Sequence, residues 1–394
     1  MSDIRYLTRS LLHHHSRLAF NGQSMMATPL TLTEDSMIEA LHHALSSEAL
    51  RPCTGLSNQW CSSLLQEDPD PSTSALTPEQ THLLETTLAE RAKRAAKRAA
   101  KQRALELERL GSDTTQASAD IEQQQQQSAA AAASTQQDLD RLRPAPGYPK
   151  QPFYRQLASM LWLWAIEGAQ PVRLQTFPVL DNQTTLDLLQ RIDRDVTPLI
   201  RECVEHWDHH DDTDQAPPID QDPLHSRLVE HRAARLARVL LQLGVRGVLV
   251  LLGVRTSQGS VDRELPPRSA LIASFNQRHS HAGSSKLTVG ARALTKHAPR
   301  DSNSWWGDTS GSEAFRNALA LAGVIRVLDK VAWINAHILP GDVEILEVRH
   351  VDGYGARWTA DGSFFRGFLE PQMEDGHHKG ACCLSLVSID RLID

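Results

Sequence analysis

The chain has 394 residues, with 41 Lys and Arg against 48 Asp and Glu, and so a formal net charge of −7. This balance argues against a protein that binds nucleic acid or an anionic membrane over its whole surface. Five cysteines without a Cys-x-x-Cys pair argue against a disulfide-stapled secreted fold and against a zinc ribbon. We therefore expect an intracellular protein of the cytoplasm or nucleus. No membrane span is expected, because no uncharged apolar run is long enough.

Aromatic residues are distributed unevenly along the chain. Only four of the 20 lie in the first 150 positions, which indicates that the core is built by the later part. Residues 1–75 are predicted to be a poorly ordered leader with one short helix, capped by Thr33. Residues 1–33 hold three arginines and one acid, a composition that suits an organelle-targeting peptide as well as an unstructured start.

A long helix is predicted over residues 76–112, from a Thr77-Pro-Glu-Gln start to Gly111. Residues 91–103 carry seven positive charges and no acid. This run is a candidate for a weak nucleic-acid contact, and the alternative is a solvated Ala/Lys/Arg helix without a specific role. Residues 113–152, which contain a run of five glutamines, are predicted to be a disordered linker.

Residues 153–255 are predicted to be a helical region. Periodicity leaves open whether residues 248–254 continue the last helix or form a short buried strand. The polar run His206-Trp-Asp-His-His-Asp-Asp-Thr-Asp is rich in His and Asp, which are ligands for transition metals. A solvated loop is the favoured interpretation, because adjacent ligands on a loop are poorly preorganised.

Residues 256–394 are predicted to form an α+β domain, so that the chain as a whole belongs to the α+β class. A capping box at Ser310–Glu313 opens a helix that is expected to reach about His337. The pattern then alternates, which predicts a small antiparallel meander with turns at Asp352-Gly353 and Asp361-Gly362.

A basic segment precedes this helix. Arg292 and Lys296 are candidate substrate-binding residues, because they lie near each other and just before Trp305-Trp306. Cations beside exposed aromatic rings suit an anion or nucleotide, although the segment lacks the glycine spacing of a phosphate loop. Two consecutive Trp residues are more often part of the core and its rim than a stacking platform.

The polar loop after the last strand gathers acids and imidazoles. The candidate catalytic residues are Glu370, Glu374, Asp375 and His377, since acid–base chemistry uses these groups. His337 and His377 are candidate metal ligands. Arg357 and Arg366 are further substrate-binding candidates, which either pair with Glu370 or bind an anionic substrate. An ordinary acidic surface loop is the alternative.

Five stretches of the later part of the chain form a distinctive set: Gly290–Arg300, Trp306-Gly307, Ala332–His337 with Leu339-Pro340, Gly353–Trp358 and Gly367–His377. They resemble an uncharacterised eukaryotic protein family that has no assigned activity. The resemblance extends over roughly residues 286–380, supports treating them as one domain, and implies no reaction.

Two classes of function remain open from the sequence. The favoured one is a binding or adaptor module with an unidentified protein partner. The alternative is an enzyme of unknown, metal-assisted acid–base chemistry at residues 370–378. No cofactor is indicated. Convergence of His297, His337, Glu370 and His377 on one pocket would favour the enzyme.

Overall fold

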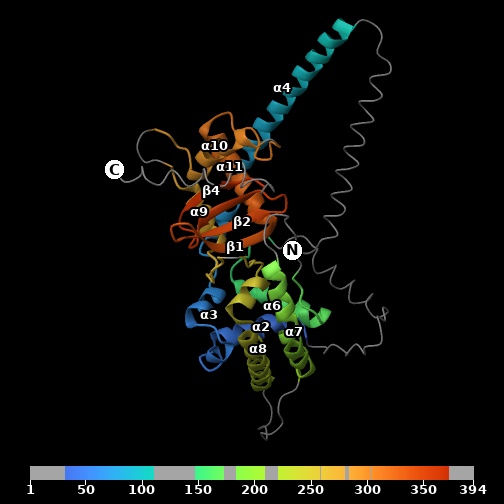
Figure 1. Cartoon of the computed structure of the whole chain (residues 1–394), viewed down its shortest axis with the longest axis vertical. Coiled ribbons are helices and arrows are strands. Elements are labelled where there is room, and N and C mark those ends of the chain that lie inside the picture. The colour runs from blue at the N-terminus through green and yellow to red at the C-terminus, as the bar shows by residue number, and fades with distance from the viewer. Residues whose placement is uncertain are drawn as a thin grey trace.

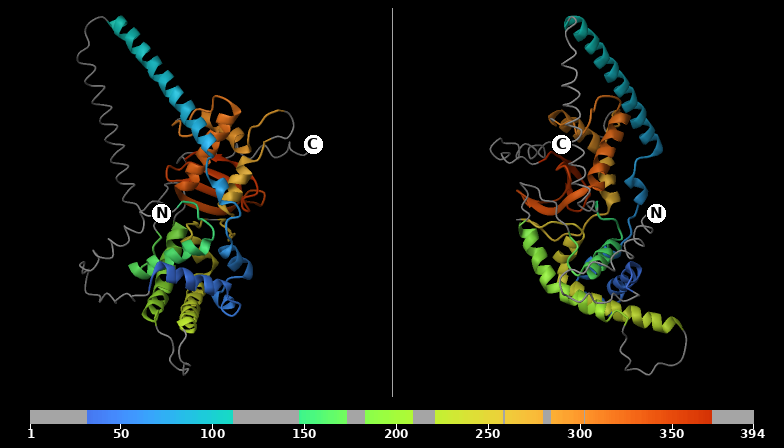
Figure 2. Two further views of the ribbon diagram at one scale, coloured as in Figure 1. Left: turned by 180° about the vertical axis from the view of Figure 1, so that it is seen from behind. Right: turned by 90° about the vertical axis from the view of Figure 1, so that its right-hand side faces the viewer.

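The computed structural model describes residues 32–110, 147–172, 183–208, 221–257, 259–279, 284–301 and 303–371. It has the predicted α+β class: a group of helices lies below a four-stranded antiparallel sheet that carries its own helices (Figures 1 and 2). The proposed targeting peptide, most of the glutamine-rich linker, and Glu374, Asp375 and His377 lie outside the described residues. None of the helices in the described part combines the length and apolarity needed to cross a membrane.

The helical group forms one core from segments far apart in the sequence. Its elements are α2 (Glu34–Ser46), η2 (Arg51–Thr54), α3 (Asn58–Leu65), α6 (Phe153–Glu167), α7 (Gln183–Glu205) and α8 (Gln221–Leu251). Helix α2 packs between α6 and α8 and buries Met37, Leu41 and Leu45 completely or almost so. The prediction of a poorly ordered leader is therefore wrong for residues 32–75. A few well-spaced aliphatic side chains suffice there, because later helices supply the aromatic part of the core.

Helix α8 ends where it meets the sheet. Gly244 has a left-handed φ of 61°, which breaks the helical geometry within the run. The helix continues to Leu251, and the chain then pairs along the free edge of strand β1 through Val254 and Ser260. Of the two alternatives for residues 248–254, the structure shows mainly helix, which ends at Leu251, and a β-bridge at Val254.

The long helix α4 (Pro78–Leu110) follows the short η3 turn (Pro71–Ser74). The predicted capping box is present: the Gln80 amide N–H donates to Thr77 Oγ1, and the Thr77 amide N–H donates to Gln80 Oε1. Only the start of α4 packs on the α+β domain, where Leu84 is buried against Phe315 of α11. The rest of the helix projects beyond that domain (Figures 1 and 2).

Three helices cover one face of the sheet. They are α9 (Arg268–Asn276), α10 (Val289–His297), which continues into η4 (Ala298–Arg300), and α11 (Glu313–Asp329). The strands follow in the order β1 (Val331–Leu339), β2 (Val343–His350), β3 (Gly355–Thr359) and β4 (Phe365–Leu369). The face toward the helices is apolar: Ile334, Val348, Ala356 and Phe368 form one continuous row across the four strands.

The prediction of a helix from Ser310 to about His337 is wrong at both ends. The N-cap is Ser312, whose hydroxyl accepts from the Phe315 amide, and α11 ends at Asp329. Residues 331–339 form β1 instead. The first six residues of β1 are all buried, so its sequence is an apolar run that helical spacing fits equally well.

Candidate functional site

The sheet face that points away from the helices carries a row of polar side chains. Asn335, Glu347, Arg357 and Gly367 are opposite one another across β1 to β4. His337 and Arg349 lie two residues further along their strands and therefore on the same face. This second face is itself largely buried at Asn335, Glu347 and Arg349, and it is more accessible at His337, Arg357 and Gly367.

Glu347 is the centre of this polar row. Its carboxylate accepts from Arg349 Nε at 2.6 Å and from Arg357 Nε at 2.7 Å, and its side chain is only 2% exposed. Burial alone would raise the pKa of Glu347, but the two guanidinium groups outweigh that effect and lower it. Glu347 is thus a buried anion that fixes both arginines, and it is poorly suited to carry a proton at neutral pH.

His337 stands beside this ion-pair network. Its Nε2 is 4.0 Å from Glu347 Oε2, and its Nδ1 is buried without a hydrogen-bond partner among the described residues. Burial lowers the pKa of His337 despite the nearby Glu347 carboxylate, and Arg357 and Arg349 lower it further. His337 is therefore a neutral imidazole on a strand, and not a residue at a helix end as predicted.

A second acid–imidazole pair lies at the β4 edge of the sheet. His297, the last residue of α10, has its Nδ1 2.9 Å from Oε1 of Glu370, which directly follows β4. The His297 side chain is 20% exposed and that of Glu370 is 37% exposed, so both are accessible. A carboxylate on one ring nitrogen orients the imidazole and leaves the other nitrogen for proton transfer.

The other nitrogen of this imidazole has open space beside it. The Nε2 of His297 lies 4.0 Å from the place that a Cβ at position 367 would occupy, and Gly367 leaves that place empty. Gly367 has a φ of 146°, a conformation that other residues rarely adopt. Glycine at this position therefore keeps the reactive edge of His297 uncovered on the β4 side.

Arg349 links the two pairs. Its Nη1 donates to the backbone oxygens of Gly353 and Glu370, while its Nε donates to Glu347. The buried anion of β2 thereby holds the loop that carries Glu370. His337 belongs to β1, whereas His297 lies at β4, three strand spacings or about 14 Å away. The structure thus brings His297 and Glu370 together but leaves His337 in a separate cluster.

Exposed cations lie on the same elements as the His297–Glu370 pair. Arg292, Lys296 and Arg300 are exposed on α10 and η4, and Arg366 is exposed on β4. The ion pairs found in the described part of the chain include none of these four. Arg357 pairs with Glu347 and not with Glu370, one of the two partners that the sequence suggested. The exposed cations are therefore suited to an anionic ligand.

The two tryptophans near this site are structural, in agreement with the sequence-based interpretation. Trp306 is buried. Trp305 has Tyr354 stacked on one side at 4.4 Å and the Arg326 guanidinium 3.5 Å from its ring centre. With its ring engaged in this way, Trp305 is a poor platform for a nucleobase. Sequence reasoning did not name Glu347, Arg349 or this aromatic cluster.

The described residues contain no group of three or more His, Cys, Asp or Glu side chains that could hold a metal ion. His337, one of the two proposed ligands, faces a single carboxylate, that of Glu347. His377, the other, is outside the described residues.

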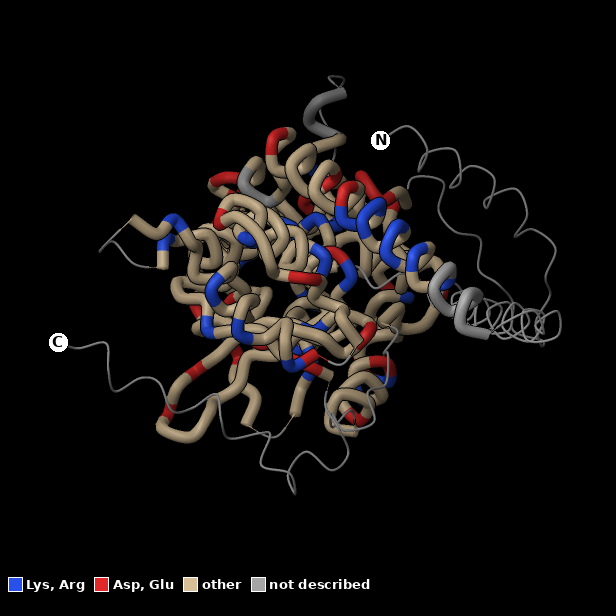
Figure 3. The backbone as a smooth tube through the Cα atoms, turned by 90° about the horizontal axis from the view of Figure 1, so that it is seen from above, with Lys and Arg blue, Asp and Glu red and all other residues tan. Residues whose placement is uncertain are grey.

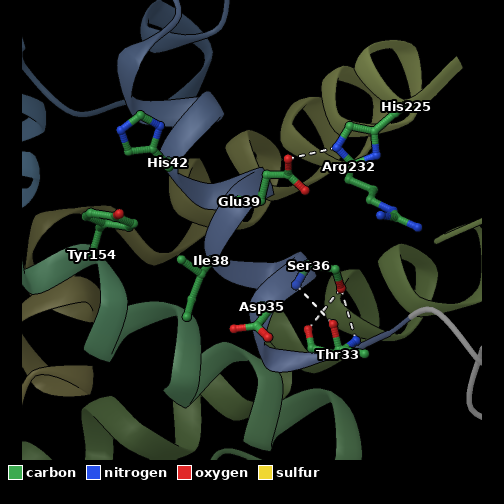
Figure 4. A pocket seen from close by; sticks show the side chains of 9 residues that line it. All are labelled: Thr33, Asp35, Ser36, Ile38, Glu39, His42, Tyr154, His225 and Arg232. Atoms are coloured by element: carbon green, nitrogen blue, oxygen red, sulfur yellow. Dashed lines mark hydrogen bonds and ion pairs between the residues drawn. The ribbon is translucent and has the colours of Figure 1, made fainter. Parts of the chain in front are cut away.

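Two hollows lie elsewhere on the molecule. One, of about 620 Å³, is formed by α2, α6 and α8, and Glu39 and His225 pair across it at 2.9 Å (Figure 4). The Arg232 guanidinium is engaged with Trp207 and Asp208. The other hollow, of about 950 Å³, is lined by four carboxylates and one arginine, Arg263, which pairs with Glu344. An acidic lining of this kind repels phosphate.

Comparison with known families gives a match that covers this region. Residues 276–370 match the model of the CdiA C-terminal tRNase toxin domain. The match begins in α9 and ends at Glu370, so it contains both acid–imidazole clusters. It covers 95 of the 394 residues, less than half of the chain.

No curated protein and no solved structure matches the chain. The family match contradicts the prediction of a binding or adaptor module, because the matched family is a nuclease toxin domain. Two of the residues named from the sequence, His297 and Glu370, lie within the matched segment.

Proposed function

We propose that residues 276–370 form a ribonuclease domain and that tRNA is its class of substrate. The observation that carries this proposal is the His297–Glu370 pair, which lies in the matched segment and is accessible to solvent. Exposed cations lie on the same elements, α10, η4 and β4. RNA is a polyanion whose 2′-hydroxyl can attack the adjacent phosphate, so an oriented imidazole and phosphate-binding cations are what its cleavage needs.

In this proposal His297 acts as the general base. Glu370 holds Nδ1, and Nε2 takes the proton of the 2′-hydroxyl. The 2′ oxygen then bonds to phosphorus, the bond from phosphorus to the 5′ oxygen breaks, and the leaving 5′ oxygen takes a proton from water. The products are a 2′,3′-cyclic phosphate and a free 5′-hydroxyl. General base catalysis of this kind typically contributes about 10²- to 10⁴-fold in rate.

Two kinds of cation would hold the phosphate. Lys296 and Arg292 precede His297 on α10 and are free to move with the RNA backbone. Arg357 is held in place, because its Nε donates to Glu347 while a quarter of its side chain stays exposed. A guanidinium fixed by a buried carboxylate needs little reordering when a phosphate binds, which favours charge stabilisation in the transition state.

A tRNA substrate also has a consequence for the cellular compartment in which the protein acts. We propose that the protein acts inside a cell, in the cytoplasm or nucleus, where tRNA is found. The resemblance to the eukaryotic family leads to a related proposal, because its stretches contain His297, Arg357 and Glu370. Members of that family that keep these three residues would share the nuclease chemistry.

The test is cleavage of tRNA by the purified full chain. We expect His297→Ala to lower the cleavage rate by at least about 10²-fold, and Glu370→Gln to lower it less, because it removes only the orientation of the imidazole. The matched control is His225→Ala, which removes the imidazole of the other 2.9 Å pair with a glutamate, far from this site. Its rate should equal that of the wild type.

Chemical analysis of the RNA termini produced completes this test. A 2′,3′-cyclic phosphate terminus and equal rates with and without EDTA would support the proposed step. Failure to cleave RNA, or unchanged cleavage by His297→Ala, would contradict the proposal.

A further inference from the structure

The outer part of α4 has two different faces. A helix turns about 100° per residue, so Lys93, Lys97 and Lys101 lie one above another, and Arg94 and Arg98 lie beside them. Along residues 92–100 the opposite face is built from alanines: Ala92, Ala95, Ala96, Ala99 and Ala100. Five cations are therefore aligned along one face, with about 6 Å between successive lysines.

These charges are largely free of acidic neighbours. Residues 91–103 contain no Asp or Glu. Of the five cations, only Arg94 forms an ion pair among the described residues, with Glu90 at 3.4 Å, and both side chains are exposed. Such a pair contributes little and leaves the field of the helix positive. In Figure 3 the Lys and Arg positions recur along α4 as it leaves the rest of the molecule.

The start of the helix is fastened to the domain proposed to be the nuclease. Arg91 donates to the backbone oxygens of Asp308 and Ser310, pairs with the Asp308 carboxylate at 3.2 Å, and lies 4.3 Å from the centre of the Phe315 ring. About two turns earlier in the helix, Leu84 is buried against Phe315 and Ala318. The direction of α4 is thus set by α11, so this helix is an arm and not a loose tether.

The arm leaves the domain at the end where α10 lies (Figures 1 and 2). From Arg91 to Leu110 it extends about 28 Å at 1.5 Å per residue. A structured RNA held at the α10 end can therefore meet a row of cations well away from the bond that is cut.

We propose that the basic face of α4 binds the phosphate backbone of the RNA that the domain cleaves. The proposal rests on the proposed nuclease function. The face has no aromatic side chain, and so it cannot stack on bases. Contacts to phosphate alone position the RNA without reading its sequence. The arm should accordingly add affinity for long, structured RNA and add nothing for a dinucleotide.

The test compares two triple variants with the same loss of charge. The first changes Lys93, Lys97 and Lys101 to Gln, which keeps a high helix propensity. The control changes Arg191, Arg201 and Arg227 to Gln, three exposed cations on α7 and α8. Binding of tRNA is measured as a function of salt, with His297→Ala present in each protein to prevent cleavage. The activity of the same triples on tRNA and on a dinucleotide is measured with His297 intact.

We expect the α4 triple to weaken tRNA binding on the order of tenfold and to lower the slope of log Kd against log salt by about 2 to 3. KM for tRNA should rise, while kcat/KM for the dinucleotide stays unchanged. Binding and slope equal to those of the control triple would overturn the role of the arm.

Failure of the nuclease proposal would give a different experimental result from failure of the proposal for α4. If the wild-type chain cleaves neither substrate, the function of the domain is wrong, whereas the binding comparison still decides whether the arm holds RNA. A change in oligomeric state of the α4 triple without a change in the salt slope would also overturn the proposal. That result would assign the helix to contacts between copies of the chain.

Discussion

Glu347 decides the geometry of the candidate site although it lies within a strand. Its carboxylate bonds Arg349 and Arg357, and Arg349 in turn holds the backbone of Glu370. We expect Glu347→Gln to leave two guanidinium groups without their buried anion. Breaking such a pair costs about 3 to 5 kcal/mol in free energy of unfolding. Urea denaturation at pH 7 measures this cost.

The pH dependence of the same variant gives the sign of the effect. Because the folded pKa of Glu347 is lowered, its stabilising effect is fully present above the unfolded value of about 4.3 and is lost as the pH falls through the folded pKa. The wild type and Glu347→Gln should therefore approach each other in stability in acid.

The control for this prediction is Glu344→Gln on the same strand. It removes a pair with Arg263 that is partly exposed to solvent, and it should change stability little. Equal losses for the two variants at pH 7 would contradict the argument.

The candidate site was only partly predictable at this scale. His297 and Glu370 were both named, because acids and imidazoles stand out in a sequence. Their pairing was not derivable, since 73 residues separate them. Glu347 was missed because it lies among Ile345, Leu346 and Val348. Its spacing of two from Arg349 was the available signal, since alternate residues of a strand share a face.

Helix starts were the most predictable elements. The side chains of Thr33 and Thr77 cap α2 and α4 as the sequence indicated. The start of β1 was not predictable, because buried strands and buried helices are both continuous apolar runs. That boundary depends on the pairing of β1 with β2 and with the segment around Val254 and Ser260, which are contacts distant in sequence.

Two helical glycines give opposite predictions for the same change. A Cβ at Gly290 in α10 would lie 2.0 Å from Phe275 Cζ, so Gly290→Ala must displace a buried ring. We expect a loss of about 1 to 3 kcal/mol, as for overpacked cores. A Cβ at Gly323 in α11 would lie 3.7 Å from Trp306, an ordinary contact. Gly323→Ala should gain about 0.5 to 1 kcal/mol from helix propensity.

Thermal unfolding of the two variants measures this difference. The midpoint should fall for Gly290→Ala and rise for Gly323→Ala. A rise for both would mean that α10 and α9 separate easily, and that the site built on α10 is not held by Phe275. A fall for both would contradict the gain predicted for Gly323→Ala.

At the scale of the whole molecule, the helical group and the sheet share one core. A single cluster of buried side chains extends from Met37 in α2 to Phe368 in β4. The backbone of Arg255 donates to Ile334 on β1, and the Tyr148 hydroxyl donates to Pro266 next to α9. These bonds join the helical group to the domain that carries the site. The region with the family match therefore depends on residues outside it.

This continuity predicts cooperative unfolding of the described chain. Leu41→Ala, in α2, should cost about 2 to 5 kcal/mol, because the side chain is fully buried. If the helical group and the α+β domain unfold as one unit, the loss of stability extends to the sheet. Hydrogen exchange followed by mass spectrometry should then show faster exchange both in α2 and in β2. Leu346→Ala, on β2 itself, serves as the reciprocal variant and should accelerate exchange in α2. Faster exchange confined to the part that carries each substitution would show that the two parts unfold independently.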